Sequence, residues 1–219
     1  MDVYFCMRSA NSQHGQKIGI VADSHGQAAC IGKALIYFRG QGCGTIYHLG
    51  DICDSAHPET ADDCVALLRQ NHIAGIKGNN DHLVVVNHQG HEHKYVSAGT
   101  IEFLKQLPMT VEHGDVIMTH SLPFVKERGL SSMVGTLGHA EAAMFFQKFP
   151  RKVLLRGHSH QPEIICRRKQ SLKTNKLLPE KTLQLDDVSP SIITCGALDQ
   201  GFVLIWDTAK QTISSHTIR

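Results

Sequence analysis

Five short groups of residues follow hydrophobic segments of this chain, and each group contains residue types that bind metals. Aspartate, histidine and asparagine side chains can bind first-row transition metals, and Asp-x-His and His-x-His each place two ligands within reach of one ion. The groups are Asp23-Ser24-His25, Gly50-Asp51, Gly78-Asn79-Asn80-Asp81, Thr119-His120-Ser121 and Gly157-His158-Ser159-His160. Any one of them alone would be an ordinary polar turn. Five in succession predict a two-metal hydrolytic site.

The segments before four of these groups have the composition of buried β-strands, being short, apolar and rich in β-branched residues. The expected strands cover residues 17–22, 45–49, 116–118 and 153–155. Open α/β sheets bind their ligands beyond the carboxyl ends of the strands. Seven candidate metal ligands are therefore expected to meet at one edge: Asp23, His25, Asp51, Asn79, His120, His158 and His160.

The spacing of apolar residues predicts helices between these strands. One helix follows His25 and buries Ile31, Ala34, Leu35 and Phe38. Further helices are expected after Pro58, from a cap at Thr100 to Pro108, and over 138–149. Strands are expected at 109–112, in a hairpin with 116–119, and at 191–194, 202–206 and 211–217, the last three antiparallel in character. The alternation of strands and helices indicates an α/β domain.

Length and composition set wider limits. The 219 residues, 42% hydrophobic and 19% charged, suit one domain over 1–219, with 1–16 as a leading extension. The formal charge of +2 gives no strong reason to expect a nucleic acid or an anionic membrane as partner. No segment is apolar enough to span a bilayer. Seven cysteines, an odd number without a Cys-x-x-Cys pair, favour a reducing, cytoplasmic setting.

One polar, basic stretch interrupts the alternation of strands and helices at 167–187. It contains Arg168, Lys169, Lys173, Lys176 and Lys181. We interpret it as a solvated loop or a long hairpin, because surface loops tolerate such insertions. The alternative is a substrate or partner contact beside the metal site.

The order of the five groups and the residues in each resemble the motifs of the calcineurin-like metallophosphoesterase superfamily. Its members carry Asp-x-His, Gly-Asp, Gly-Asn-His-Asp/Glu, a lone His and Gly-His-x-His, and the match runs over about 17–160. The compact size looks most like the small single-domain phosphodiesterases of bacteria and archaea. The resemblance implies a four-layer α-β-β-α sandwich, in which helices flank two mixed sheets.

The resemblance also implies how the seven ligands are divided between two divalent ions. One ion would be held by Asp23, His25, Asp51 and His160, and the other by Asp51, Asn79, His120 and His158. Asp51 would bridge the ions at a separation of about 3.5–4 Å, and a bridging hydroxide would attack phosphorus in line. The mixed imidazole and carboxylate ligands favour Mn, with Fe, Zn, Ni or Co as alternatives, over Mg or Ca.

Two departures from the family pattern concern the groups around the ligands. Asn80 occupies the place of a histidine thought to protonate the leaving oxygen, and an amide cannot act as a general acid. His82 and His57 are alternative proton donors, and Asp81 is expected to orient a ligand or water. The residues that follow Asp51, 52–55, lack the phosphate-binding arginine of the superfamily's protein phosphatases, which argues against that activity.

The leading hypothesis is a metal-dependent hydrolase of small phosphate esters, with phosphodiesters favoured. A phosphomonoesterase or a nucleotide pyrophosphohydrolase is the alternative enzyme. A protein-binding scaffold, as in one retromer subunit of this fold, is the alternative outside enzymes. Retention of all seven ligands favours catalysis. The sequence leaves the substrate, the native metal and homo-oligomerisation open.

Overall fold

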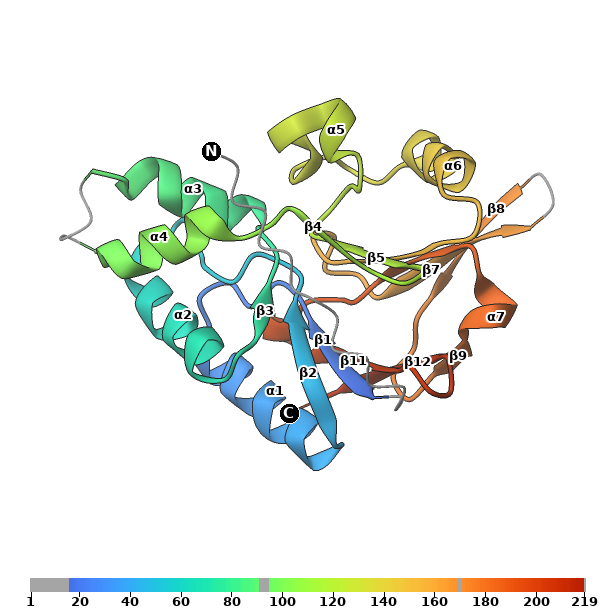
Figure 1. The fold of residues 1–219 in the computed structure, drawn as a ribbon, viewed down its shortest axis with the longest axis horizontal. Coiled ribbons are helices and arrows are strands. Elements are labelled where there is room, and N and C mark those ends of the chain that lie inside the picture. Colours follow the sequence, from blue (N-terminus) through green and yellow to red (C-terminus); the bar gives the residue numbers. More distant parts are fainter. Residues whose placement is uncertain (1–15, 91–94, 169–170, 219) are drawn as a thin grey trace.

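Figure 1 shows the computed structural model of the protein, which describes residues 16–90, 95–168 and 171–218. Two six-stranded sheets lie face to face with helices outside them. The first sheet has the order β3 (Ala74–Gly75), β2 (Cys43–His48), β1 (Lys17–Val21), β11 (Phe202–Asp207), β12 (Thr212–Thr217), β9 (Thr182–Gln184). The second has the order β4 (Thr110–His113), β5 (Val116–Thr119), β6 (Val153–Arg156), β10 (Ser191–Thr194), β7 (Glu163–Arg168), β8 (Ser171–Lys176).

The helices lie mainly on the outer faces of these sheets (Figure 1). The first sheet is covered by α1 (Ala28–Gly40), α2 (Ala61–Gln70), α3 (Asn79–His88) and α4 (Ala98–Gln106). The second sheet is covered by α6 (His139–Lys148). Short helical segments complete the described chain: η1 (Pro58–Thr60), α5 (Val125–Arg128), η2 (Gly129–Ser132), α7 (Leu185–Val188) and η3 (Leu198–Gln200).

Both sheets are mixed, and the strands that precede the predicted ligands are parallel within each sheet. In the first sheet β1 is parallel to β2, and β2 to β3, whereas β11 is antiparallel to β1. In the second sheet β5, β6 and β10 are parallel, flanked by antiparallel β4 and β7. The carboxyl ends of each parallel set therefore share one edge of their sheet.

Alternate residues of the central strands fill different layers of the core. On β1, Ile18 and Ile20 face the second sheet, whereas Val21 packs with the helices that cover the first. On β6, Leu155 belongs to the core between the sheets, and Leu154 packs with the α6 side of the second sheet. The period of two residues sends successive side chains to opposite faces. The three core clusters separate four layers, so the predicted α-β-β-α arrangement is confirmed.

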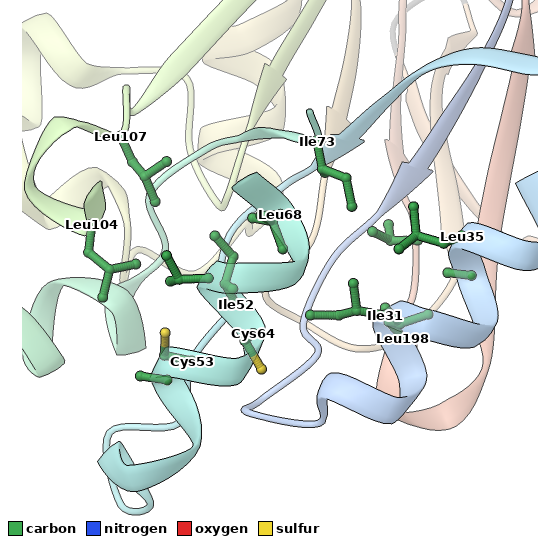
Figure 2. Close-up of a cluster of buried hydrophobic side chains, with 14 of the residues drawn as sticks. Ile31, Leu35, Ile52, Cys53, Cys64, Leu68, Ile73, Leu104, Leu107 and Leu198 are labelled. Atoms are coloured by element: carbon green, nitrogen blue, oxygen red, sulfur yellow. The ribbon is translucent and has the colours of Figure 1, made fainter. Parts of the chain in front are cut away.

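Most of the predicted elements agree with the structure to within two residues. The four strands before the ligand groups are β1, β2, β5 and β6, and the predicted hairpin is β4–β5. The helix after His25 is α1, which buries Ile31, Ala34, Leu35 and Phe38 as expected. Figure 2 shows Ile31 and Leu35 of α1 beside Leu198.

The helix α3 was not predicted from the sequence. The strand β3 is only two residues long, and Asn79 is the first residue of α3. Within α3, Leu83 and Val86 are exposed while Val84 and Val85 are buried. Residues 83–86 are four consecutive apolar residues, three of them β-branched, so they show no helical period. Such a local sequence favours a strand.

The predicted cap of α4 was also wrong. The N-cap is Ser97, whose hydroxyl accepts a hydrogen bond from the backbone N–H of Thr100, and the helix ends at Gln106 rather than Pro108. Thr100 is buried inside the first turn. Serine and threonine are both good caps, and the register of the helix on the sheet decides between them.

The C-terminal strands are antiparallel except β10, which pairs in parallel with β6 as well as antiparallel with β7. The parallel pairing was not predicted. A strand of four buried residues, Ser191–Thr194, looks the same in sequence whichever direction its neighbours take.

The basic stretch at 167–187 is a long hairpin followed by a short strand and a helical turn. The hairpin joins β7 to β8, and the remainder contains β9 and α7. The side chains of Leu177, Leu183 and Leu185 are buried between the sheets. The long hairpin of the interpretation is therefore present, and part of the stretch is packed in the core rather than solvated. Lys169 and most of the leading extension 1–16 lie outside the described residues.

Among the described residues, no helix combines the length and the apolar character that crossing a membrane would require.

Two neighbouring residues of α1 give a test of this packing. The Leu35 side chain is 6% exposed and Ile36 is 73% exposed. We expect Leu35→Ala to lower the free energy of unfolding by about 2–5 kcal/mol, because it removes buried methyl groups. Ile36→Ala is the control and should change it by less than about 0.5 kcal/mol. Urea unfolding followed by circular dichroism measures both, and equal losses would contradict the observed orientation of α1.

Candidate metal centre

The seven predicted ligands lie in the loops after β1, β2, β5 and β6 and in the first turn of α3. Backbone hydrogen bonds join these loops in pairs. In the first sheet, Asp23 N donates to Gly50 O at 3.0 Å and Ser24 N donates to Asp51 O at 3.0 Å. In the second sheet, Gly157 N donates to His120 O at 3.0 Å. The strand pairing thus continues beyond the strands and fixes each ligand loop to its neighbour.

Side chains then connect the two sheets at this edge. The backbone N–H of His158 donates to both carboxylate oxygens of Asp23, at 3.1 and 3.0 Å. A ring nitrogen of His120, Nδ1, lies 2.9 Å from the carbonyl oxygen of Leu49. Ligands from both sheets are therefore brought to one place.

Five of the seven predicted ligands have a backbone in the left-handed region. The φ angles are 56° for Asp23, 44° for His25, 52° for Asp51, 71° for His158 and 58° for His160. Among the described residues only three other non-glycine residues, His72, Glu180 and Gln211, share this conformation. Such a conformation costs about 1–3 kcal/mol per residue and persists where the surroundings enforce it. The strain is concentrated on the predicted ligands.

Two glycines of the ligand groups allow backbones to approach each other closely. A Cβ at Gly78 would collide with the backbone nitrogen and the carboxylate of Asp51. A Cβ at Gly157 would lie 2.6 Å from Asp23 Oδ2. Glycine at these places is required by the approach of one ligand loop to another.

The first group of donor atoms consists of Asp23, His25 and His160, with all three atoms within 4.8 Å of one another. The Nε2 atoms of His25 and His160 are 2.9 Å apart, and His160 Nε2 lies 3.7 Å from Asp23 Oδ1. Ligand bonds of about 2.0–2.2 Å leave two donors on one ion about 3–4 Å apart. The three side chains therefore fit a single divalent ion.

The second group surrounds the Nε2 atom of His120. This atom lies 3.0 Å from Asn79 Oδ1, 3.2 Å from His158 Nδ1 and 3.5 Å from Asp51 Oδ1. The carbonyl of Leu49 can only accept, so His120 Nδ1 carries the proton and Nε2 offers its lone pair to the group. A second ion fits these four side chains.

A further set of donor atoms contains one carboxylate from each group. Asp23, Asp51 and His120 also place one donor atom each within 4.8 Å of one another. This set joins the first group to the second, and the bridging role of Asp51 stays a prediction. Both carboxylates lie between the two groups of histidines.

Burial sets the charge of these groups. Burial and the neighbouring Asp51 raise the pKa of Asp23 well above its usual range. Burial lowers the pKa of His120 to about 4 and also lowers the pKa values of His158 and His160. Neutral imidazoles are metal ligands, and two buried carboxylates side by side require nearby positive charge. The electrostatics thus suit divalent cations.

The residues that follow Asn79 hold the Asp51 loop. Asn80 donates to Asp51 through its backbone N–H at 2.8 Å and through its side-chain amide at 2.7 Å. Its own amide oxygen accepts from the hydroxyl of Ser55 at 2.7 Å. The carboxylate of Asp81 is fully buried and accepts from the backbone N–H groups of Cys53 and Gly78, both at 2.9 Å. Burial, followed by the charge of Asp51, raises the pKa of Asp81 to about 7.

Neither of the two predicted proton donors is buried. His82 is partly exposed in the first turn of α3. His57 is exposed, and its ring nitrogen lies 3.3 Å from Glu59. Asn80 and Asp81 are hydrogen-bonded to the Asp51 loop, whereas the ring of His57 contacts Glu59.

Three residues near the ligands were not predicted. Arg156 is 1% exposed and donates to the carbonyl oxygen of Ser121 at 2.9 Å, next to the ligand His120. His48 is fully buried at the end of β2. Both were visible in the sequence as polar residues inside apolar strands. After the larger effect of burial, the charge of the Asp199 carboxylate acts to raise the pKa values of Asp23 and His160. No local sequence pattern indicated this residue.

Comparisons with known proteins identify the family of this chain. Residues 17–176 match the family model of the calcineurin-like phosphoesterase superfamily domain. A search of curated proteins found no match. A metallophosphoesterase from Sphaerobacter thermophilus aligns with a TM-score of 0.74 at 20% identity, over 94% of this chain and 88% of that one.

Two further solved structures share the fold. A hypothetical protein from Pyrococcus horikoshii aligns with a TM-score of 0.61 at 11% identity, over 93% of this chain and 88% of that one. A serine/threonine phosphatase from Saccharomyces cerevisiae aligns with a TM-score of 0.52 at 15% identity, over 95% and 81%. The family match covers most of the chain, which therefore belongs to the calcineurin-like phosphoesterase superfamily and is a phosphoester hydrolase.

Proposed function

We propose that this protein is a binuclear metal-dependent phosphoesterase that hydrolyses small phosphate esters, with phosphodiesters favoured. The observation that carries the proposal is the convergence of two groups of donor atoms around one pair of buried carboxylates, Asp23 and Asp51. One ion would be held by Asp23, His25, Asp51 and His160. The other would be held by Asp51, Asn79, His120 and His158.

Bound ions at these positions would supply Lewis-acid activation of a water and of the phosphoryl oxygens. The protein's own residues prepare that chemistry. Burial keeps His120 neutral, and the carbonyl of Leu49 selects its tautomer. Asn80 holds both oxygens of Asp51, and Ser55 orients the amide of Asn80. The mixture of imidazole and carboxylate ligands favours Mn, with Fe, Zn, Ni or Co as alternatives.

The preference for phosphodiesters rests on the amide at Asn80, since the small phosphodiesterases that the sequence resembles often lack a histidine at that place. A phosphomonoesterase or a nucleotide pyrophosphohydrolase would use the same metal site, so the reaction with mono- and diesters decides between them. A protein-binding scaffold is disfavoured by the donor set, which is complete and in which Asp23, Asp51 and His120 are buried. The cytoplasmic location is proposed on the free cysteines, six of which are described.

Metal removal and replacement test the two-ion site directly. We expect the dialysed apoprotein to take up two Mn²⁺ ions per chain in a calorimetric titration and to lose hydrolysis of bis-para-nitrophenyl phosphate on chelation. Activity should return with Mn²⁺, because the donor groups supply ligands for both ions. Uptake of at most one ion, with chelator-resistant activity, would exclude the binuclear site.

Substitution of Asp51, the proposed bridging carboxylate, should lower turnover and metal occupancy more than substitution of His82, which is not among the seven ligands. We expect Asp51→Asn to lower turnover by more than about 100-fold, beyond the typical 10–100-fold effect of residues that only support ligands. The variant should also bind fewer ions, since one negative charge is lost between the two groups. His82→Ala is the matched control and should retain both ions. Equal losses of turnover with full metal occupancy in both variants would show that Asp51 is not shared and that His82 matters more.

The amide at Asn80 leads to a prediction about leaving groups. General acid catalysis is worth about 10²–10⁴-fold, and an amide cannot provide it. We therefore expect turnover to fall steeply as the pKa of the leaving group rises across a series of aryl and alkyl phosphodiesters. Asn80→His should raise turnover selectively for the poorer leaving groups, with metal content measured in parallel because Asn80 contacts Asp51. A flat dependence in the unmodified protein would point to His57 or His82 as the acid.

A further inference from the structure

A buried histidine outside the metal-binding groups is hydrogen-bonded to the first ligand turn. His48 is the last residue of β2 and is fully buried. Its Nε2 atom lies 2.9 Å from the hydroxyl oxygen of Ser24, the residue between the ligands Asp23 and His25. The same hydroxyl lies 3.0 Å from the carbonyl oxygen of Ile52, which follows the ligand Asp51. One chain of hydrogen bonds thus links the first ligand turn to the second.

The direction of this chain follows from its last acceptor. A carbonyl oxygen can only accept, so the single hydroxyl proton of Ser24 is donated to Ile52. The bond between Ser24 and His48 must then be donated by the ring, which places the proton on Nε2. Burial lowers the pKa of His48 to about 3, consistent with a neutral ring. The bare Nδ1 atom has no hydrogen-bond partner among the described residues.

The unpartnered Nδ1 atom indicates that His48 is not present only to stabilise the fold. A buried polar atom without a partner is destabilising, and an aliphatic side chain would fill the same place in the strand without that cost. The residue on either side, Tyr47 or Leu49, is packed in the core between the sheets. What His48 provides, and an aliphatic residue would not, is a fixed N–H donor directed at Ser24.

The turn that receives this donor is strained. Asp23 and His25 have φ angles of 56° and 44°, and Ser24 lies between them. The backbone N–H groups of all three residues are bonded to the second ligand turn, and the hydroxyl of Ser24 fastens the middle of the turn by a side-chain hydrogen bond. A ligand site needs its donors held to within about 0.5 Å, and groups that lock a ligand's surroundings supply that precision.

We propose that His48 is a positioning residue that acts through Ser24 to hold Asp23 and His25 in the geometry of the first metal ion. The inference rests on the proposed metal centre and deepens it. His48 contacts neither metal nor substrate. Its effect is on the affinity of the ion held by Asp23, His25 and His160, and much less on the ion held by His120 and His158.

The test is a calorimetric titration of the apoprotein with Mn²⁺, compared among variants that remove each member of the chain. Ser24→Ala removes the hydroxyl, and His48→Phe keeps a ring of similar size without the donor. Each should weaken one binding step by about 10–100-fold, the usual effect of residues that orient metal ligands. The weakened step should be the one that His25→Ala abolishes. The double variant should lose no more than the stronger single variant, because both break the same chain.

The structure offers a matched control in the same sheet. On β12, the ring of His216 lies 2.9 Å from the hydroxyl of Ser214, the same pair of groups at the same distance, in a strand that carries no predicted ligand. Ser214→Ala should leave both Mn²⁺ affinities unchanged. Circular dichroism of each apoprotein confirms that the titrated variants are folded, and Ser24→Ala remains informative if His48→Phe does not fold.

The possible results separate the inference from the proposed function. Two ions bound with unchanged affinities in Ser24→Ala and His48→Phe would overturn the positioning role alone. Equal weakening of both steps would assign the chain to general stabilisation of the loops and would also overturn it. Failure of the unmodified protein to bind Mn²⁺ would overturn the metal centre, and the positioning role with it.

Discussion

The arrangement of the candidate metal centre depends on the contacts of the Asp23 carboxylate. This carboxylate follows β1 of the first sheet and accepts two hydrogen bonds from the backbone N–H of His158, which follows β6 of the second. One of its oxygens also lies within 4.8 Å of donor atoms of Asp51 and His120, in the second group. Because Asp23 is fully buried beside Asp51, protonation or a nearby cation must compensate the two charges. The site is therefore built to hold positive charge at the junction of the sheets.

The sandwich supports the strained ligand turns. Residues of β1 and β6, among them Ile20 and Leu155, fill the core between the sheets and fix their separation. Backbone bonds such as Asp23 N to Gly50 O then carry the strand pairing into the ligand loops. Left-handed conformations at five ligands would relax in an isolated peptide, since each costs about 1–3 kcal/mol. Packing on both sides of the sheets holds them.

Around the candidate ligands, three loops are each held by a buried polar residue from another element. Asp81 joins the start of α3 to the Asp51 loop, and Arg156 holds the loop that follows His120. His48 reaches the first ligand turn through Ser24. Burial of such groups is costly unless they are hydrogen-bonded, so their presence is explained by the loops they fix. The amide of Asn80 belongs to the same pattern, since its hydrogen bonds are directed at Asp51 and Ser55 rather than left free for a leaving group.

The sequence by itself determined the family, the main strands and the seven candidate ligands, because metal-ligand chemistry and strand composition are local properties of short segments. It also determined the buried face of α1 through helical spacing. Only the tertiary structure decided that Asp23 lies beside Asp51 and His120, that α3 begins at Asn79, and that His48 contacts Ser24. These features depend on contacts between residues distant in the chain, whose partners are set by strand register and by the distance between the sheets. No local pattern encodes such distances, because they arise when the two sheets pack.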